Sequence, residues 1–266
     1  MTKAPVFFIS HGAPTFALEP GTLGPRLNVL GKALSKAAAV LVVSPHWQTR
    51  DVRVMTTPTP ETIHDFGGFP AALYELQYPA QGHPVLAAEA GRLLAKAGFA
   101  ASFDDRRGLD HGAWVPLFHL LPAADIPVFQ VSMPDQLDTA GAVTLGQALA
   151  PLRDQGVAIV CSGSMTHNLH EFRQGDVGEA AYVQEFRNWV RQAVVADAVE
   201  RAVAYRQYAP HAARAHPTEE HFLPLLVALG ARADGETAQV IEADTTYGVI
   251  SMESYMWGDN ERVRHE

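Results

Sequence analysis

Short, almost continuously apolar runs alternate along this chain with longer segments rich in Ala and Leu. The apolar runs are rich in β-branched and aromatic residues, which favours strands at 5–10, 39–44, 52–57, 127–133, 157–163 and 238–244. Strands that are apolar on both faces are typical of a parallel sheet covered by helices. Helices are predicted at 83–98, 140–156, 180–196 and near 219–230. The alternation predicts an α/β fold with a central, mainly parallel (mixed) sheet flanked by helices.

The length of 266 residues, with 47% hydrophobic residues, is enough for one large core. No repeat, low-complexity tract or linker interrupts the chain, so residues 1–266 are expected to form a single domain. The segment 56–84 departs from the regular alternation because it is rich in Pro, Gly and aromatic residues. It is expected to be a long ordered loop, and such loops are more often functional than structural.

The chain is acidic, with a formal net charge of -9. No run of basic residues is longer than the pair Arg106-Arg107, which argues against nucleic acid or an anionic membrane as the main partner. The N-terminus is interrupted too early for a signal peptide, and no apolar stretch reaches the roughly 20 residues that span a bilayer. A cytoplasmic protein is therefore expected. The single cysteine, Cys161, excludes an intramolecular disulfide and a Cys-rich zinc site.

Several of the 12 histidines lie in turns rich in Gly, Pro and Ser. His11, His46 and His167 each come just after a predicted strand, where ligands bind in open α/β sheets. His111 lies in a glycine-flanked loop, "LDHGAW". Imidazole is the commonest metal ligand, so convergence of these side chains would form a mononuclear site for Zn, Fe or Mn. The alternative is a set of loop and core histidines that bond to the backbone.

Other motifs give weaker signals. Neither a G-x-G-x-x-G nor a P-loop motif is present, so nothing supports dinucleotide or P-loop binding. The stretch "CSGSMT" lacks the G-x-S-x-G of a nucleophile elbow, which disfavours Ser162 and Ser164 as nucleophiles. His170 would share a helical face with His167, but a position facing solvent is expected for it.

A set of six motifs, taken in order, resembles the DODA-type extradiol ring-opening dioxygenases, which belong to the wider LigB-like (class III) superfamily. The resemblance extends from His11 to the C-terminal "VISMESYMW". The motifs are "FFISHGAP", "VVSPHW", "TIHDFGGFP", "LDHGAW", "CSGSMTHNL" and "HPTEEHFLPLL". The third and the last are the most distinctive, whereas "SHG" alone would mean little.

The resemblance implies a LigB-like fold, a mononuclear non-haem Fe(II) and a catechol substrate, DOPA-like or related. Zn(II) often replaces the iron in isolated protein of this family. With O₂, the catechol ring is opened beside rather than between its hydroxyls, to a muconic semialdehyde-type product. Matching the motifs assigns the metal ligands to His11, His46 and His221. Because the wider superfamily commonly uses a glutamate as third ligand, Glu219 and Glu220 remain alternatives, as does His216.

The resemblance also implies roles around the metal. His167 is expected to act as acid and base, and His111 to line the substrate pocket. Residues expected to contact the substrate are His64, Trp47 and Phe69, although a packing role is an equal alternative for the two apolar side chains. Two other functions use the same histidines: a zinc hydrolase that activates water, and a non-catalytic LigB-like protein that binds a metal or ligand. The oligomeric state is not predicted.

Overall fold

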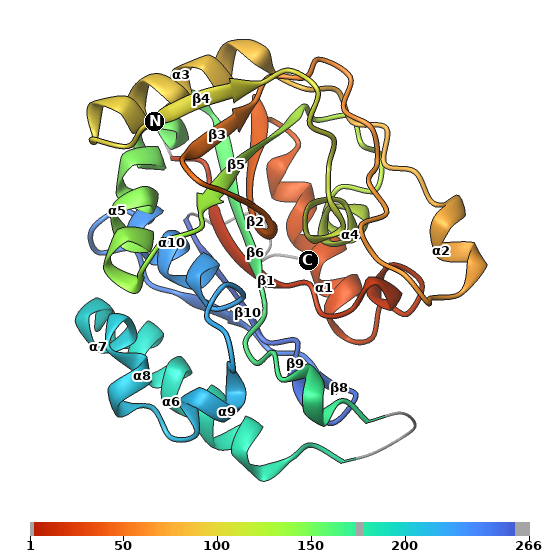
Figure 1. The fold of residues 1–266 in the computed structure, drawn as a ribbon, viewed down its shortest axis with the longest axis vertical. Coiled ribbons are helices and arrows are strands. Elements are labelled where there is room, and N and C mark those ends of the chain that lie inside the picture. Colours follow the sequence, from red (N-terminus) through yellow and green to blue (C-terminus); the bar gives the residue numbers. More distant parts are fainter. Residues whose placement is uncertain (1–2, 174–177, 259–266) are drawn as a thin grey trace.

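The computed structural model describes residues 3–173 and 178–258. Its largest feature is one sheet with the strand order β4-β3-β5-β2-β6-β1-β10-β7 (Figure 1). The parallel centre consists of β5 (Val128–Pro134), β2 (Ala39–Thr49), β6 (Val157–Gly163) and β1 (Val6–Ser10). Antiparallel pairings occur toward both edges, where the outer strands are β10 (Ser254–Trp257), β7 (Gln239–Ile241), β3 (Val52–Met55) and β4 (Ala101–Asp104). The predicted α/β class with a mixed, mainly parallel sheet is confirmed.

Helices cover the sheet on two sides (Figure 1). One layer contains α3 (Pro84–Lys96), α5 (Thr139–Leu149) and α10 (Leu223–Ala231), and the other contains α1 (Leu23–Gly31) and α4 (His111–Leu120). All residues of β1 and β6 are buried between these layers. Helix α10 approaches α5 so closely that a Cβ on Gly146 would lie 2.0 Å from the Val227 carbonyl oxygen. These two layers explain why the central strands are apolar on both faces.

The remaining elements lie mostly in the C-terminal half, and apart from the 15-residue helix α6 they are short. They are α2 (Ala71–Glu75), α6 (Ala181–Val195), α7 (Val199–Val203), α8 (Tyr205–Tyr208), α9 (Ala212–Ala215), β8 (Thr245–Thr246) and β9 (Ile250–Ser251). The described residues also include the 3-10 turns η1 (Pro14–Ala17), η2 (Lys32–Leu34), η3 (Ala150–Gln155) and η4 (Leu169–Glu171). Within the described residues, no helix is long and apolar enough to cross a membrane.

Two predicted boundaries near the histidines were wrong. Strand β2 continues to Thr49, beyond a register shift after Val43, so His46 lies within the strand and not after it. His111 is the first residue of helix α4, not part of a loop. The side chain of Asp110 caps this helix by accepting a hydrogen bond from the Ala113 amide at 3.2 Å, which allows the helix to start directly at His111.

The segment 56–84 is ordered, as predicted, and has little regular structure besides α2. It is attached to the start of α4 through backbone hydrogen bonds of 2.8 Å from the Ile63 amide to the Leu109 carbonyl and from the Leu109 amide to the Glu61 carbonyl. The Trp114 indole donates a further bond of 3.0 Å to the Ile63 carbonyl. These bonds hold the middle of the segment against the helix that carries His111.

Candidate metal centre and active site

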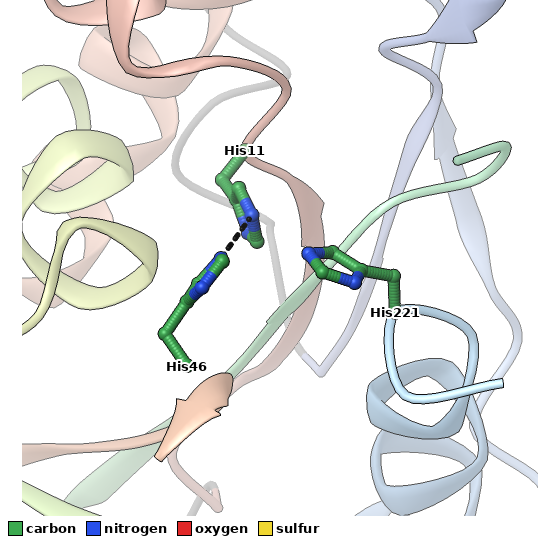
Figure 2. Close-up of side chains that lie close together, drawn as sticks. All are labelled: His11, His46 and His221. Carbon is green, nitrogen blue, oxygen red and sulfur yellow. Dashed lines mark hydrogen bonds between the residues drawn. The ribbon is translucent and has the colours of Figure 1, made fainter. Parts of the chain in front are cut away.

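Three neighbouring parallel strands bring histidines to one edge of the sheet. His11 directly follows β1, His46 lies near the end of β2, and His167 follows β6. A fourth histidine, His221, does not belong to a strand and lies in the segment that leads into α10. Figure 2 shows the side chains of His11, His46 and His221 pointing toward one another. The convergence predicted for His11 and His46 is therefore present in the fold, with His221 as the third member of the group.

The backbone after β1 turns sharply at Gly12, which has a φ of +62°. A Cβ at this position would lie 2.7 Å from the Met252 sulfur, so the turn favours glycine for its conformation, and a larger residue would force the Met252 side chain to shift. The His11 amide donates a hydrogen bond of 2.9 Å to the Gly163 carbonyl of β6. This turn and the strand pairing together fix the direction of the His11 side chain.

The inner nitrogens of the three imidazoles form a compact group. One nitrogen from each of His11, His46 and His221 lies within 4.8 Å of the others. The Nε2 atoms of His11 and His46 are 3.2 Å apart. Nε2 of His221 is buried and has no hydrogen-bond partner among the residues that the structure describes. An unpartnered buried nitrogen is costly unless something else binds it, and a metal ion would do so.

Each of the three rings has a polar neighbour on its outer nitrogen, Nδ1. Nδ1 of His11 lies 2.8 Å from the Ser162 hydroxyl, and Nδ1 of His221 donates to Glu220 at 3.0 Å. Nδ1 of His46 lies 3.8 Å from a carboxylate oxygen of Asp65. Such outer partners orient a ligating imidazole, and the two carboxylates, which can only accept, favour the tautomer whose Nε2 carries the lone pair.

The three rings are held in their neutral form. Burial is the main reason that the pKa values of His11 and His221 are well below the usual value, and neighbouring histidines lower them further. Burial and the nearby His111 lower the pKa of His46 to about 4. Because neutral imidazole is the form that binds metals, this donor set fits a divalent transition metal.

Two more histidines border the group. The ring of His167 stacks on that of His221, with centroids 3.5 Å apart and planes 10° from parallel. Burial lowers the pKa of His167 to about 4. The ring of His111 lies against that of His46 at 3.9 Å, and both its Nδ1 and its backbone amide donate to Asp65. Burial by itself raises the pKa of Asp65, but the bonds from His111 outweigh it and lower this pKa to about 2.

The alternatives to His221 have other partners. Glu219 accepts hydrogen bonds from the Tyr205 hydroxyl and from Arg206, at 2.9 and 3.1 Å. His216 is fully buried, and its Nε2 lies 2.9 Å from the Met165 carbonyl oxygen. Burial lowers the pKa of His216 to about 3. Glu220 forms a second possible ligand group with His167 and His221, besides its bond to the His221 ring.

The residues expected to bind substrate lie at different depths. His64 Nε2 donates to the Leu76 carbonyl at 3.0 Å, so this nitrogen is bonded to the backbone. Trp47 is buried, with only 5% of its surface exposed, and the Arg107 guanidinium lies 5.1 Å above its ring. Phe69 is partly buried and packs edge-to-face on Phe66 at 5.5 Å.

Sequence reasoning missed two residues beside the site. Asp65 contacts both His46 and His111, and the ring of Phe66 lies 5.6 Å from that of His111. Both belong to the motif "TIHDFGGFP", in which only His64 was predicted to contact the substrate. A carboxylate adjacent to a candidate active-site histidine was the available signal.

Comparison with known proteins identifies the family. Residues 25–256 match the family described as the catalytic LigB subunit of aromatic ring-opening dioxygenase. This chain belongs to the LigB family. The predicted family and enzyme class are thereby confirmed: the protein is a ring-opening dioxygenase of the extradiol group, which acts on a small molecule and O₂.

Curated relatives of this LigB enzyme match over almost their full length. A protein of Beta vulgaris named 4,5-DOPA dioxygenase extradiol is 42% identical over 253 residues, 94% of both chains. A protein of Escherichia coli K12 with the same name is 36% identical and covers 97% of this chain and 96% of its own. The crystal structure of an uncharacterized protein from Escherichia coli K12 superposes with a TM-score of 0.79 at 30% identity, covering 96% of this chain and 99% of the other.

Proposed function

We propose that this LigB enzyme opens the ring of a DOPA-like catechol on the extradiol side, and that residues 1–266 act as a single catalytic domain. The relatives named 4,5-DOPA dioxygenase extradiol support this substrate class. The reaction adds both atoms of O₂ to the catechol and releases nothing, so its product is a muconic semialdehyde-type acid. Family membership favours this chemistry over a zinc hydrolase or a binding protein built on the same histidines.

His11, His46 and His221 would hold one Fe(II), for which Zn(II) can substitute in isolated protein. The observation that carries this assignment is the buried, unpartnered Nε2 of His221, which lies with the inner nitrogens of the other two rings. Held by these three imidazoles, Fe(II) would bind the catechol and O₂ and would lower the pKa of the catechol hydroxyls.

His167 would accept a proton from a catechol hydroxyl and later return it to the opening ring. Two observations support this role: the His167 ring stacks on His221, and its lowered pKa keeps it neutral. A neutral imidazole can accept a proton and then donate it. His111, beside His46, would hydrogen-bond the bound substrate. These two residues flank the proposed ligands on different sides.

The substrate ring would lie under the segment 56–84. We assign contacts to His64, Trp47 and Phe69, and the aromatic neighbours Phe66 and Tyr74 extend the same apolar surface near His64. Such rings exclude water and fix the plane of a catechol. The bond from His64 to the Leu76 carbonyl limits this residue to a contact through its ring edge or Nδ1.

A single-turnover experiment tests the proposal. Protein loaded with one equivalent of Fe(II) is mixed with DOPA without oxygen and then exposed to air. We expect one O₂ to be consumed for each DOPA and a yellow semialdehyde to form. Zn(II)-loaded protein is the matched control and should produce no colour. No oxygen uptake with DOPA or simpler catechols, at confirmed iron occupancy, would overturn the proposed function.

A further inference from the structure

Asp65 occupies a position between two imidazoles of the site. One of its carboxylate oxygens, Oδ1, accepts hydrogen bonds from the His111 amide at 2.8 Å and from His111 Nδ1 at 3.0 Å. The other, Oδ2, lies 3.8 Å from Nδ1 of His46. Asp65 belongs to the segment 56–84 and bonds directly to His111 of helix α4.

These bonds determine which nitrogen of His111 carries the hydrogen. A carboxylate can only accept, so the Nδ1 that faces it must be the donor. In a neutral imidazole the hydrogen on Nδ1 leaves Nε2 with a free lone pair. In that tautomer Nε2 of His111 is an acceptor, which suits a bond from a hydroxyl of a bound catechol.

The same carboxylate orients the ring as well as the tautomer. His111 is the first residue of α4, where backbone amides lack partners within the helix, and Asp65 satisfies its amide. Because one oxygen binds both the amide and the ring of His111, the side chain is restricted to a single rotamer. The second oxygen, near His46 Nδ1, favours the hydrogen there too and so leaves His46 Nε2 to face His11.

We propose that Asp65 is a positioning residue for the ring-opening reaction: it holds His111 in the Nδ1–H tautomer, ready to accept from the substrate, and supports the orientation of His46. This inference rests on the function proposed above. It also ties the substrate-covering segment to the site, since Asp65 belongs to 56–84 while His111 belongs to α4. The carboxylate of Asp65 would thus position both the segment 56–84, which covers the substrate, and the imidazole of His111.

Another interpretation of the same geometry is a second metal site. Ligand atoms of His46, Asp65 and His111 also lie within 4.8 Å of one another. The hydrogen bonds from His111 to Asp65 disfavour it, because a ligating Nδ1 could not carry the hydrogen that this geometry requires. Metal stoichiometry separates the two interpretations.

The test compares Asp65→Asn and Asp65→Ala with Glu61→Gln, which removes an exposed carboxylate from the same segment. With Fe(II) bound, we expect both Asp65 variants to keep one metal per chain and to lose about 10- to 100-fold in kcat, with a smaller change in KM. Zn(II)-loaded protein with ¹⁵N-labelled histidine should show an Nδ1–H signal for His111, assigned by its absence in His111→Gln. This signal should be lost in Asp65→Ala and kept in Glu61→Gln.

Three outcomes would overturn the proposal: an unchanged His111 tautomer in Asp65→Ala, equal losses of kcat in Glu61→Gln, or two metals in the wild type that fall to one without Asp65. Failure of the proposed function would look different. In that case the wild type would not open catechols, while the His111 signal would still depend on Asp65.

Discussion

The imidazole rings of His167 and His221 lie face to face, with centroids 3.5 Å apart and planes 10° from parallel. His221 is also bonded to Glu220 through Nδ1. This bond restrains rotation of the imidazole within its plane, and the stack with His167 restrains the tilt of that plane. His167 comes from the end of β6 and His221 from the segment before α10, so the stack joins two distant parts of the chain. It places a proposed proton carrier directly beside a proposed metal ligand.

Replacing His167 with Gln should leave the metal bound but reduce ring opening by about 10²- to 10⁴-fold, because no side chain then carries the substrate proton. Metal analysis and initial rates of oxygen uptake measure the two effects. His170→Gln, in the exposed 3-10 turn η4, is the control and should retain full activity. Unchanged turnover in His167→Gln would show that His167 is not the acid and base of the reaction.

Replacing His221 or His11 with Ala should abolish stoichiometric metal binding, because each substitution removes one of three nitrogen ligands. The measurement is metal content after dialysis against a weak chelator. His211→Ala, which removes a partly exposed imidazole paired with Glu185, should bind metal normally. Full occupancy in either of the first two variants would exclude that residue from the ligand set.

Glu220→Gln should weaken metal binding by about 10- to 100-fold, because a neutral amide holds the Nδ1 hydrogen of His221 less strongly. Competition with a chromophoric chelator measures the affinity. Glu219→Gln is the matched control, since Glu219 bonds to Tyr205 and Arg206 instead. If Glu219→Gln lost the metal and Glu220→Gln kept it, a glutamate rather than His221 would be the third ligand.

His216 should make folding stability depend on pH. Its pKa is lowered to about 3 in the folded state, whereas an unfolded histidine titrates near 6.5. Between these values the unfolded chain binds the extra proton, so the free energy of unfolding falls as the pH is lowered, by up to about 1.4 kcal/mol per pH unit for this group.

The matched variant His216→Gln can still donate to the Met165 carbonyl but cannot titrate. Denaturant unfolding of metal-free protein at pH 5 and 6 should show a shallower pH dependence for the variant, by about one proton. If the free energy of unfolding depended equally on pH in the two proteins, the pKa of His216 would not be lowered by folding.

Gly12→Ala should lower both stability and metal content. The positive φ of +62° costs an L-residue about 1–2 kcal/mol, and the new Cβ would displace Met252 or the turn that aims His11. Gly98→Ala separates these effects, because Gly98 also has a positive φ but no atom within 4 Å of the added Cβ. Only Gly12→Ala should lose metal. Equal metal content in the two variants would show that the contact with Met252 does not affect the position of His11.

Much of the fold follows from local patterns. The apolar runs around β1, β2 and β6 predict buried parallel strands, and the structure confirms them within a few residues. Strand β4 was not predicted, because it has only four residues, Ala101–Asp104, of which the middle two are exposed, and so lacks an apolar run. The true end of β2 was missed as well, since its pairing with β5 resumes only after a register shift that depends on the partner strand.

The sequence by itself determined the α/β class, the family and the histidines that could converge, because strand ends and quoted motifs are local features. Only the tertiary structure decided which atoms meet. The packing of α4 against the segment 56–84 brings Asp65 to His111, and the approach of α10 to the sheet brings His221 against His167. Partners far apart in the chain leave no periodic trace in the sequence, so the tautomers and burial that make these histidines neutral ligands became visible only in three dimensions.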